Sequence, residues 1–288
     1  MKLLVTGAQG MLGHDVRRVG ERAGHELILV DLPELDITDE HAVVCFYERE
    51  RPEATINCAA WTDVDGAESK REAAHAVNAE GAGNLARASA SIDSPLLHIS
   101  TDYVFDGSAP LDGAGRPRPY VESDATGPRS VYGETKLAGE LQVLAACAAH
   151  TVVRTAWLYG IDGPNFVATM LRLAGEREAV QVVDDQIGSP TWSGHLAPAI
   201  LGLLERQVSG LVHLTGAGSV SWNGFAKEIF RQAEMDCRVE AATTAEMARP
   251  APRPAWSAME SEREDVLAMP DWRDGLAGYL AARVGVNR

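Results

Sequence analysis

Two side chains that could transfer a proton lie four residues apart in the middle of the chain. They are Tyr132 and Lys136, within the stretch SVYGETK at residues 130–136. Because positions i and i+4 of a helix share one face, a phenol and an ammonium at these positions point into the same space. A nearby cation favours the phenolate and lowers a phenol pKa that begins at about 10. The pair therefore predicts a proton donor that works near neutral pH, as the reduction of a carbonyl group requires.

A glycine-rich turn near the N-terminus indicates which cofactor could work with this pair in redox chemistry. Residues 2–6 form a short apolar run of strand length, and the G-x-x-G-x-x-G spacing of Gly7, Gly10 and Gly13 follows directly. An amphipathic helix comes next, and a second strand ends on Asp31. Glycines let the backbone approach a pyrophosphate, a helix N-terminus offers N–H groups, and a carboxylate accepts ribose hydroxyls. The pattern predicts a dinucleotide cofactor.

Composition and charge exclude several classes of protein. The 288 residues are 45% hydrophobic and 23% charged, enough for one large domain or a domain with a smaller lobe. No apolar run approaches the roughly 18 residues of a membrane span, and Met1 leads directly into a strand, so we expect neither a membrane segment nor a signal peptide. The four scattered cysteines favour a reduced, cytoplasmic protein. A net charge of −15 argues against a nucleic-acid partner.

The eight histidines are dispersed without the spacing of metal ligands, so no metal site is assigned. His98 lies in an apolar run and is expected to be a core side chain rather than a ligand.

Strands and helices alternate over the first 156 residues. The apolar runs predict strands over 2–6, 26–30, 54–57, 95–100 and 151–155, and helices over 39–49, 68–90 and 132–149. Such alternation predicts an α/β fold, a Rossmann-type doubly wound parallel sheet covered on both faces. Residues 1–156 are the expected NAD(P)-binding Rossmann domain.

Beyond residue 156 the strands and helices no longer alternate regularly. Helices are predicted over 165–174 and 222–235, the second capped by Ser221, and strands over 180–183 and 211–214. The proline-rich segment RPAPRP at residues 249–254 excludes a regular helix or a central strand. Residues 157–288 are therefore expected to form mainly a smaller, interleaved substrate-binding lobe at the strand ends, where α/β folds bind ligands.

Together these motifs resemble the extended short-chain dehydrogenase/reductase superfamily and, within it, the dTDP-4-dehydrorhamnose reductase family. Besides the glycine turn and the tyrosine–lysine pair, the resemblance rests on STDYVFDG at 100–107, RTAW at 154–157, INCAAWTDVD at 56–65, AVNA at 76–79 and VDDQIGSPT at 183–191. It covers nearly the whole chain and is weakest after about residue 220. The STDYVFDG run is its most specific part.

The resemblance implies reduction of the C4 ketone of dTDP-4-dehydro-β-L-rhamnose to dTDP-L-rhamnose. It makes Tyr132 the proton donor, Lys136 the cation that lowers the Tyr132 pKa and binds the nicotinamide ribose, and Thr101 the holder of the substrate oxygen. The implied cofactor-binding residues are Gly7, Gly10, Met11, Leu12, Gly13, Asp31, Asp36, Ile37, Ala59, Ala60, Thr62, Tyr132 and Lys136. The implied sugar-binding residues are Thr101, Asp102, Tyr103 and Trp157, with a core aromatic as the alternative for Tyr103 and Trp157.

The choice of cofactor depends on which groups face the adenosine ribose. Asp31 favours an unphosphorylated ribose, whereas Arg17 and Arg18, one turn past Gly13, are the alternative partners for a 2′-phosphate. Because the resemblance implies that either cofactor is accepted, we expect NADPH or NADH. It also implies a homodimer with magnesium at the interface, and no residue is assigned to that metal.

An acidic protein needs local cations to hold a dTDP-sugar, whose pyrophosphate is negatively charged. The best candidates are Arg249 and Arg253 in the proline-rich segment, since guanidinium groups bind phosphate oxygens in a forked geometry. The alternative is an ordinary surface loop with solvated arginines.

Two other functions share these motifs. One is a ketoreductase for another dTDP-4-keto-deoxysugar, for example of the dihydrostreptose type. The other is a non-catalytic NADP-binding partner, like the regulatory subunit of methionine adenosyltransferase, which resembles this family. The presence of Thr101, Tyr132 and Lys136 favours an enzyme.

Overall fold

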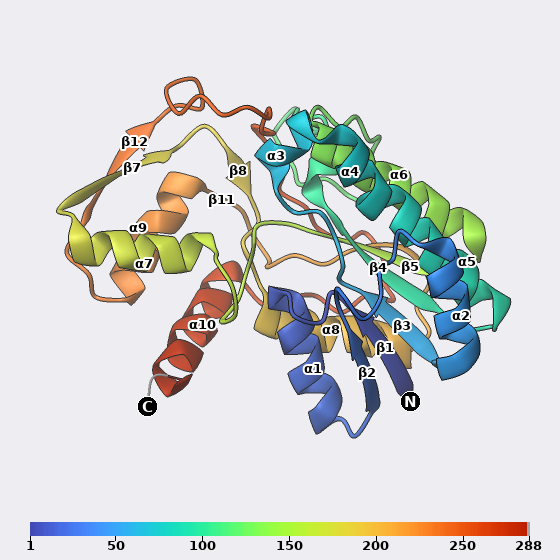
Figure 1. The fold of residues 1–288 in the computed structure, drawn as a ribbon. Coiled ribbons are helices and arrows are strands. Elements are labelled where there is room, and N and C mark those ends of the chain that lie inside the picture. Colours follow the sequence, from blue (N-terminus) through green and yellow to red (C-terminus); the bar gives the residue numbers. More distant parts are fainter. Residues whose placement is uncertain (287–288) are drawn as a thin grey trace.

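Six parallel strands form the central sheet, in the order β10-β5-β4-β3-β1-β2 (Figure 1). The computed structural model describes residues 1–286. The strands are β1 (Lys2–Thr6), β2 (Glu26–Val30), β3 (Ala54–Asn57), β4 (Leu96–Thr101), β5 (Thr151–Thr155) and β10 (Gly210–His213). Parallel strands covered on both faces are apolar along their whole length, which is why their sequences read as continuous apolar runs.

Helices cover both faces of this sheet, as the doubly wound class requires. On one face α1 (Met11–Arg22) and α8 (Ser193–Glu205) pack over a core that includes Leu12 and Ile200. On the other face lie α2 (Glu40–Glu50), α5 (Ala82–Ser91) and α6 (Val131–Ala146), whose core includes Phe46 and Leu85 (Figure 1). The predicted α/β fold with a Rossmann-type sheet is confirmed.

The long helical stretch predicted over 68–90 is helical from 71 to 91 but is interrupted at Lys70 and contains a π-helical turn. Its pieces are α3 (Val64–Ser69), α4 (Arg71–His75), a π-helical turn η1 (Ala76–Gly81) and α5. The break comes at Lys70, whose backbone leaves the helical region. The π turn brings Gly81 so close to Ile37 that a Cβ on the glycine would lie 2.7 Å from that side chain.

The predicted end of the next helix is also wrong by three residues. Helix α6 ends at Ala146 rather than 149, because Cys147 takes an extended conformation with φ of −160°.

A second lobe is built around its own aromatic core. Its core includes Phe225, Trp272 and Tyr279. The elements are α7 (Phe166–Glu176), α9 (Trp222–Gln232) and α10 (Trp272–Val286), with the strand pairs β7 (Ala179–Val183)/β12 (Arg238–Ala242), β6 (Leu158–Tyr159)/β9 (Thr191–Trp192) and β8 (Ile187–Gly188)/β11 (Val220–Ser221). As predicted, Ser221 caps α9, since its hydroxyl accepts the Gly224 N–H at 3.0 Å.

The second half of the chain contributes to both parts of the molecule. Helix α8 and strand β10 return to the central sheet, where β10 pairs with β5 along residues 210–213. The strand predicted over 211–214 is thus a central-sheet strand. Across residues 1–286, no helix is long and apolar enough to cross a membrane.

Candidate active site

The order of the strands reverses between β1 and β3, and the glycine turn lies at this point. In doubly wound sheets the crevice beyond the carboxyl ends of the strands at such a switch point binds ligands. Gly7 has φ of +64°, and a Cβ there would lie 2.6 Å from the Ala59 backbone nitrogen. A Cβ on Gly13 would lie 2.4 Å from the Gly7 carbonyl oxygen. Both positions require glycine, because the turn, the helix and the chain after β3 are in backbone contact.

The turn leaves the N-terminus of α1 open to an anion. Gly10 is the N-cap residue, no side chain caps the helix, and its first turn holds no acidic residue. The backbone N–H groups of the first turn, which includes Met11 and Leu12, and the positive end of the helix dipole therefore meet no carboxylate of the helix itself. These residues fit a pyrophosphate.

The groups expected around the adenosine end of the cofactor are fixed by short contacts. The Asp31 carboxylate accepts the Gln9 N–H at 3.0 Å and the Leu32 N–H at 2.9 Å, so it is held against the glycine turn. Asp36 is exposed and accepts the Thr38 N–H at 2.9 Å, while the Ile37 side chain is buried.

The two arginines proposed as alternative ligands for a 2′-phosphate are already paired with acids. Arg17 lies 2.8 Å from Glu21 along the same helix. Arg18 lies 2.7 Å from Asp15 and also contacts Asp162. Their charges are therefore partly neutralised within the protein.

The connection after β3 carries Ala59, Ala60 and Thr62. The Ala59 N–H donates to the Asn57 side-chain oxygen at 3.0 Å, and this residue lies against Gly7. Ala60 and Thr62 follow along the same connection, and Thr62 is exposed.

The end of β4 and the first turns of α6 bring the catalytic candidates together. Thr101 is the last residue of β4, and Tyr132 and Lys136 lie on α6. The Ser130 hydroxyl caps α6 by accepting the Gly133 N–H at 3.2 Å. A Cβ on Gly133 would lie 2.2 Å from the Tyr103 carbonyl oxygen, so only glycine lets the helix approach the strand end this closely. The Tyr132 ring meets the Tyr103 ring edge-on at 5.4 Å.

The electrostatics of the pair differ from the expectation that Lys136 lowers the Tyr132 pKa. Burial raises the pKa of Tyr132 to about 12, the Thr101 hydroxyl acts in the opposite direction, and the Asp102 charge adds to the rise. The physical reason is that the lysine side chain contacts β4. Its Nζ donates to the Ile99 carbonyl at 2.6 Å and lies 3.2 Å from His98 Nε2. Burial also lowers the pKa of Lys136, to about 8.

Asp102 is a buried carboxyl group next to Thr101. Only 2% of the residue is exposed, and its Oδ1 accepts the Thr101 hydroxyl at 3.0 Å. Its Oδ2 is buried and accepts no hydrogen bond within residues 1–286. Burial raises the pKa of this carboxyl to about 6, although the nearby hydroxyl groups of Ser257 and Thr101 oppose the rise.

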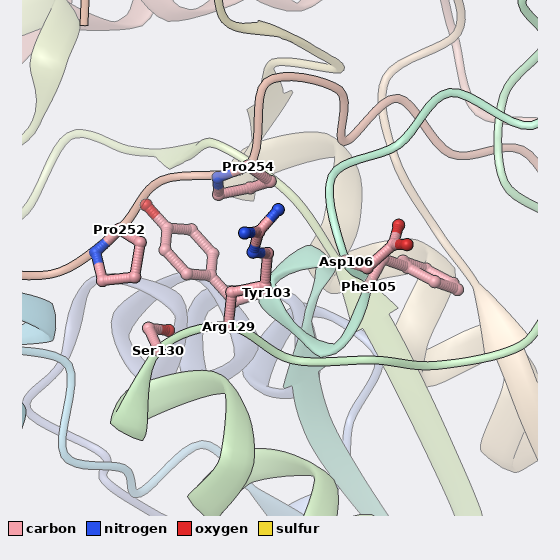
Figure 2. A pocket seen from close by; sticks show the side chains of 7 residues that line it. All are labelled: Tyr103, Phe105, Asp106, Arg129, Ser130, Pro252 and Pro254. Carbon is pink, nitrogen blue, oxygen red and sulfur yellow. The ribbon is translucent and has the colours of Figure 1, made fainter. Parts of the chain in front are cut away.

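The proline-rich segment closes over Tyr103. Figure 2 shows the Tyr103 ring between Pro252 and Pro254, in a small pocket that Ser130 also lines. The Arg253 guanidinium lies 5.9 Å from the centre of the Tyr103 ring, a cation–π geometry.

Both arginines of the segment face one carboxylate from the first half of the chain. Arg253 donates to Asp65 at 3.0 Å, and Arg249 lies 3.9 Å from the same carboxylate. The Arg253 side chain is 11% exposed and that of Arg249 is 58% exposed, so only Arg253 is enclosed. Asp65 was not foreseen as their partner, because nothing in the sequence brings residues 65 and 253 together.

Trp157 is held in an unusual position between the two lobes. Its φ of +47° lies in the left-handed region, which a tryptophan rarely adopts. Its ring stacks on Trp222 at 3.5 Å, and a Cβ on Gly188 would lie 2.3 Å from it. Trp222, which the sequence analysis placed only on a helix, is thus the residue that orients Trp157.

A central sheet with a glycine turn at its switch point and a tyrosine–lysine pair on the helix that connects β4 to β5 defines an NAD(P)-dependent oxidoreductase of Rossmann type. A family model described as the RmlD substrate binding domain matches residues 1–284. The dTDP-4-dehydrorhamnose reductase of Mycobacterium tuberculosis is 46% identical over 288 residues, covering 98% of this chain and 93% of that protein. The chain belongs to the dTDP-4-dehydrorhamnose reductase family.

Solved structures of this family have the same fold. The crystal structure of the dTDP-4-dehydrorhamnose reductase from Clostridium acetobutylicum matches with a TM-score of 0.93 at 40% identity, covering 98% of this chain and 99% of that one. The Bacillus anthracis dTDP-4-dehydrorhamnose reductase, crystallised in complex with NADP, matches with a TM-score of 0.93 at 39% identity and the same coverage. Within residues 1–286 of the present chain, no group of three or more histidine, cysteine or acidic side chains is arranged to hold a metal ion.

Proposed function

We propose that this protein reduces the C4 ketone of dTDP-4-dehydro-β-L-rhamnose to dTDP-L-rhamnose and that Thr101, Tyr132 and Lys136 carry the reaction. The observation that supports it most is the meeting of these three residues at the carboxyl end of β4, which neighbours the switch-point strand β3. NADPH or NADH, when bound, supplies the hydride.

The residues of this chain position the substrate and supply the proton. Burial keeps Tyr132 protonated in the free protein, so its hydroxyl proton is available for the developing C4 alkoxide. The Thr101 hydroxyl holds the substrate oxygen in line with Tyr132. Lys136 binds the nicotinamide ribose hydroxyls and, as an ammonium, favours loss of the Tyr132 proton. This division of roles needs positioning and local charge rather than a covalent intermediate.

The cofactor would extend from this cluster across the switch point. Gly7, Gly10 and Gly13 would admit its pyrophosphate to the N-terminus of α1. Asp31 would accept adenosine ribose hydroxyls, with Asp36 and Ile37 beside the adenine. Ala59, Ala60 and Thr62 would line the path to the nicotinamide.

The substrate would lie between the two lobes. Asp102, Tyr103 and Trp157 would contact the sugar, and Arg253, with Arg249 near the surface, would bind the pyrophosphate of the dTDP group. We therefore treat residues 1–156 as the NAD(P)-binding unit and 157–288 as mainly substrate-binding, apart from the return through α8 and β10.

The test is direct turnover by the purified protein. We expect oxidation of NADPH or NADH with dTDP-4-dehydro-β-L-rhamnose, and formation of dTDP-L-rhamnose identified by mass spectrometry and NMR. Other dTDP-4-keto-6-deoxy sugars serve as controls. Faster turnover of one of those sugars would assign a different ketoreductase, and tight NADP binding without turnover of any of them would favour a regulatory role.

We also propose a homodimer that acts in the cytoplasm. The resemblance implies the dimer, and all four cysteines are free thiols, as expected in a reducing compartment. Light scattering coupled to size exclusion would measure the mass, and a monomer at micromolar concentration would refute the dimer.

A further inference from the structure

A chain of buried polar groups leads from β1 across the sheet to Lys136. The Thr6 hydroxyl donates to Asn57 Oδ1 at 2.7 Å, Asn57 Nδ2 lies 2.9 Å from His98 Nδ1, and His98 Nε2 lies 3.2 Å from Lys136 Nζ. None of the four residues is more than 2% exposed. Buried polar networks are expected to be fully satisfied, so the direction of each hydrogen bond can be deduced.

The orientation of the Asn57 amide fixes the tautomer of His98. The Ala59 backbone N–H lies 3.0 Å from Asn57 Oδ1, and because an N–H can only donate, that atom is the carbonyl oxygen. The NH₂ group of Asn57 therefore faces His98 Nδ1, which must accept. A neutral imidazole has one donor and one acceptor, so its proton lies on Nε2. Burial also lowers the pKa of His98 well below its ordinary value, which keeps the ring neutral.

This tautomer points an N–H group at Lys136. An ammonium has three donors and no acceptor, whereas a neutral amine has a lone pair. The contact between His98 Nε2 and Lys136 Nζ is therefore a hydrogen bond only when the lysine is neutral and donates to the Ile99 carbonyl. The charge that acts on the lysine from elsewhere is that of Glu140 on α6, which favours the ammonium. Cys58 after β3 lies nearby, but burial raises the pKa of its thiol to about 12, so it is uncharged.

We propose that His98, held by Asn57 as its Nε2–H tautomer, is a positioning residue that favours the neutral amine of Lys136 in the free enzyme, so that at alkaline pH cofactor binding takes up a proton. The proposal deepens the proposed function, because it rests on Lys136 as the cation that binds the nicotinamide ribose. The network thereby makes the charge of Lys136 depend on the cofactor at alkaline pH. Cofactor affinity then falls as pH rises. The fall begins at a lower pH than it would if Lys136 had the ordinary pKa of a lysine.

The tautomer itself can be read by NMR without any activity. In protein with ¹⁵N-labelled histidine, one of the eight histidines should be a non-titrating Nε2–H tautomer, and its signals should vanish in His98→Gln. An Nδ1–H tautomer or an imidazolium at this position would overturn the proposal, whether or not the protein turns over a dTDP-sugar.

The functional consequence is tested by NADPH affinity as a function of pH. In Asn57→Asp, a carboxylate accepts from Thr6, Ala59 and His98 Nδ1–H, so His98 presents a bare Nε2 that accepts from the Lys136 ammonium. The pH at which NADPH affinity is lost on the alkaline side should rise by about one unit or more, because one hydrogen bond to a charged group has an effect of this size.

The matched control is the double variant Asn57→Asp/His98→Phe, which keeps the new negative charge but has no imidazole. The pH at which this double variant loses NADPH affinity should rise less than it does in Asn57→Asp. Equal shifts in the two variants would mean that the charge alone acts and that His98 does not set the state of Lys136. Failure of the wild type to bind NADPH at any pH would instead reject the proposed function, and the NMR result would still decide the tautomer.

Discussion

At the scale of single residues, the site shows that a spacing of four residues on a helix does not by itself set the pKa of a phenol. Tyr132 and Lys136 lie four residues apart, as the sequence predicts, yet the lysine turns toward β4 and the phenol pKa is raised to about 12. The phenol therefore keeps its proton in the free protein. Its activation has to wait for the bound cofactor and substrate to change the surroundings of the lysine.

Replacing Tyr132 by phenylalanine isolates the proton transfer. Tyr132→Phe should lower kcat by about 10²–10⁴-fold, the usual contribution of general acid catalysis. NADPH affinity should stay within a few-fold, because the ring and its edge-on contact with Tyr103 remain. Steady-state turnover and a fluorescence titration measure the two quantities. Near-normal turnover would reject Tyr132 as the proton donor.

Asp102 makes stability depend on pH with a defined sign. Its ordinary pKa is 3.8 and its folded value is about 6, so between these values the folded protein holds a proton that the unfolded chain has released. Stability therefore falls as pH rises through this window, and the full cost is present above about pH 6.

Asp102→Asn removes this ionisation. We expect it to raise the free energy of unfolding near neutral pH by at most about 3 kcal/mol and to leave it nearly unchanged near pH 4. Urea unfolding of both proteins at the two pH values measures the difference. Parallel pH profiles would show that Asp102 is not the responsible group.

At the scale of elements, the placement of Tyr132 depends on how α6 begins. Ser130 caps the helix two residues before Tyr132, and Ser221 caps α9 in the same way in the other lobe. Each cap satisfies a backbone N–H that would otherwise lack a partner. The two serines therefore offer matched substitutions, one on the helix of Tyr132 and Lys136 and one on the helix whose Trp222 stacks on Trp157.

Ser130→Ala and Ser221→Ala should each lower the free energy of unfolding by about 1 kcal/mol, the usual cost of losing a cap. Ser130→Ala should lower kcat more than Ser221→Ala, because a frayed first turn of α6 misplaces the Tyr132 hydroxyl, whereas fraying of α9 acts only through the contact of Trp222 with Trp157. Denaturation curves and turnover of both variants check this. Equal kcat values in the two variants would show that the cap does not position the phenol.

The elements also show what a sequence can predict. The strands of the Rossmann half were predictable because burial on both faces makes each a continuous apolar run bounded by turns. The two-residue strands such as 187–188 and 191–192 have no such signal, since tertiary contacts alone create them. The return of 210–213 to the central sheet was missed for the same reason, because its partner strand β5 is distant in the chain.

The same limit applies to the candidate site. Residue types and spacing singled out the glycine turn and Thr101, Tyr132 and Lys136. They gave no sign that Trp222 would stack on Trp157 or that Asn57 and His98 would reach the lysine, because those contacts join separate elements.

At the scale of the whole molecule, the two lobes are joined at the segment proposed to bind the substrate pyrophosphate. Asp65, near the start of α3, accepts the Ala251 N–H at 3.1 Å and the Arg253 guanidinium at 3.0 Å. The chain has a net charge of −15, so its overall field repels a dTDP-sugar. Arg253 must then either serve as a link between the lobes or leave part of its charge available to the pyrophosphate.

Arg253→Ala and Asp65→Ala, alone and combined, separate these roles. If Arg253 binds the pyrophosphate, Arg253→Ala should raise the KM for the dTDP-sugar more than about tenfold, since a hydrogen bond between charged groups contributes about 1.5–3 kcal/mol. Asp65→Ala should raise it much less, and the KM for NADPH should change little in either variant, because the proposed binding site of that pyrophosphate is the glycine turn. Arg249→Ala, which removes the exposed neighbour, should have a smaller effect. If Arg253 is only a link, removal of either partner should do equal damage and the double variant no more, the non-additivity expected of two residues that act as one unit.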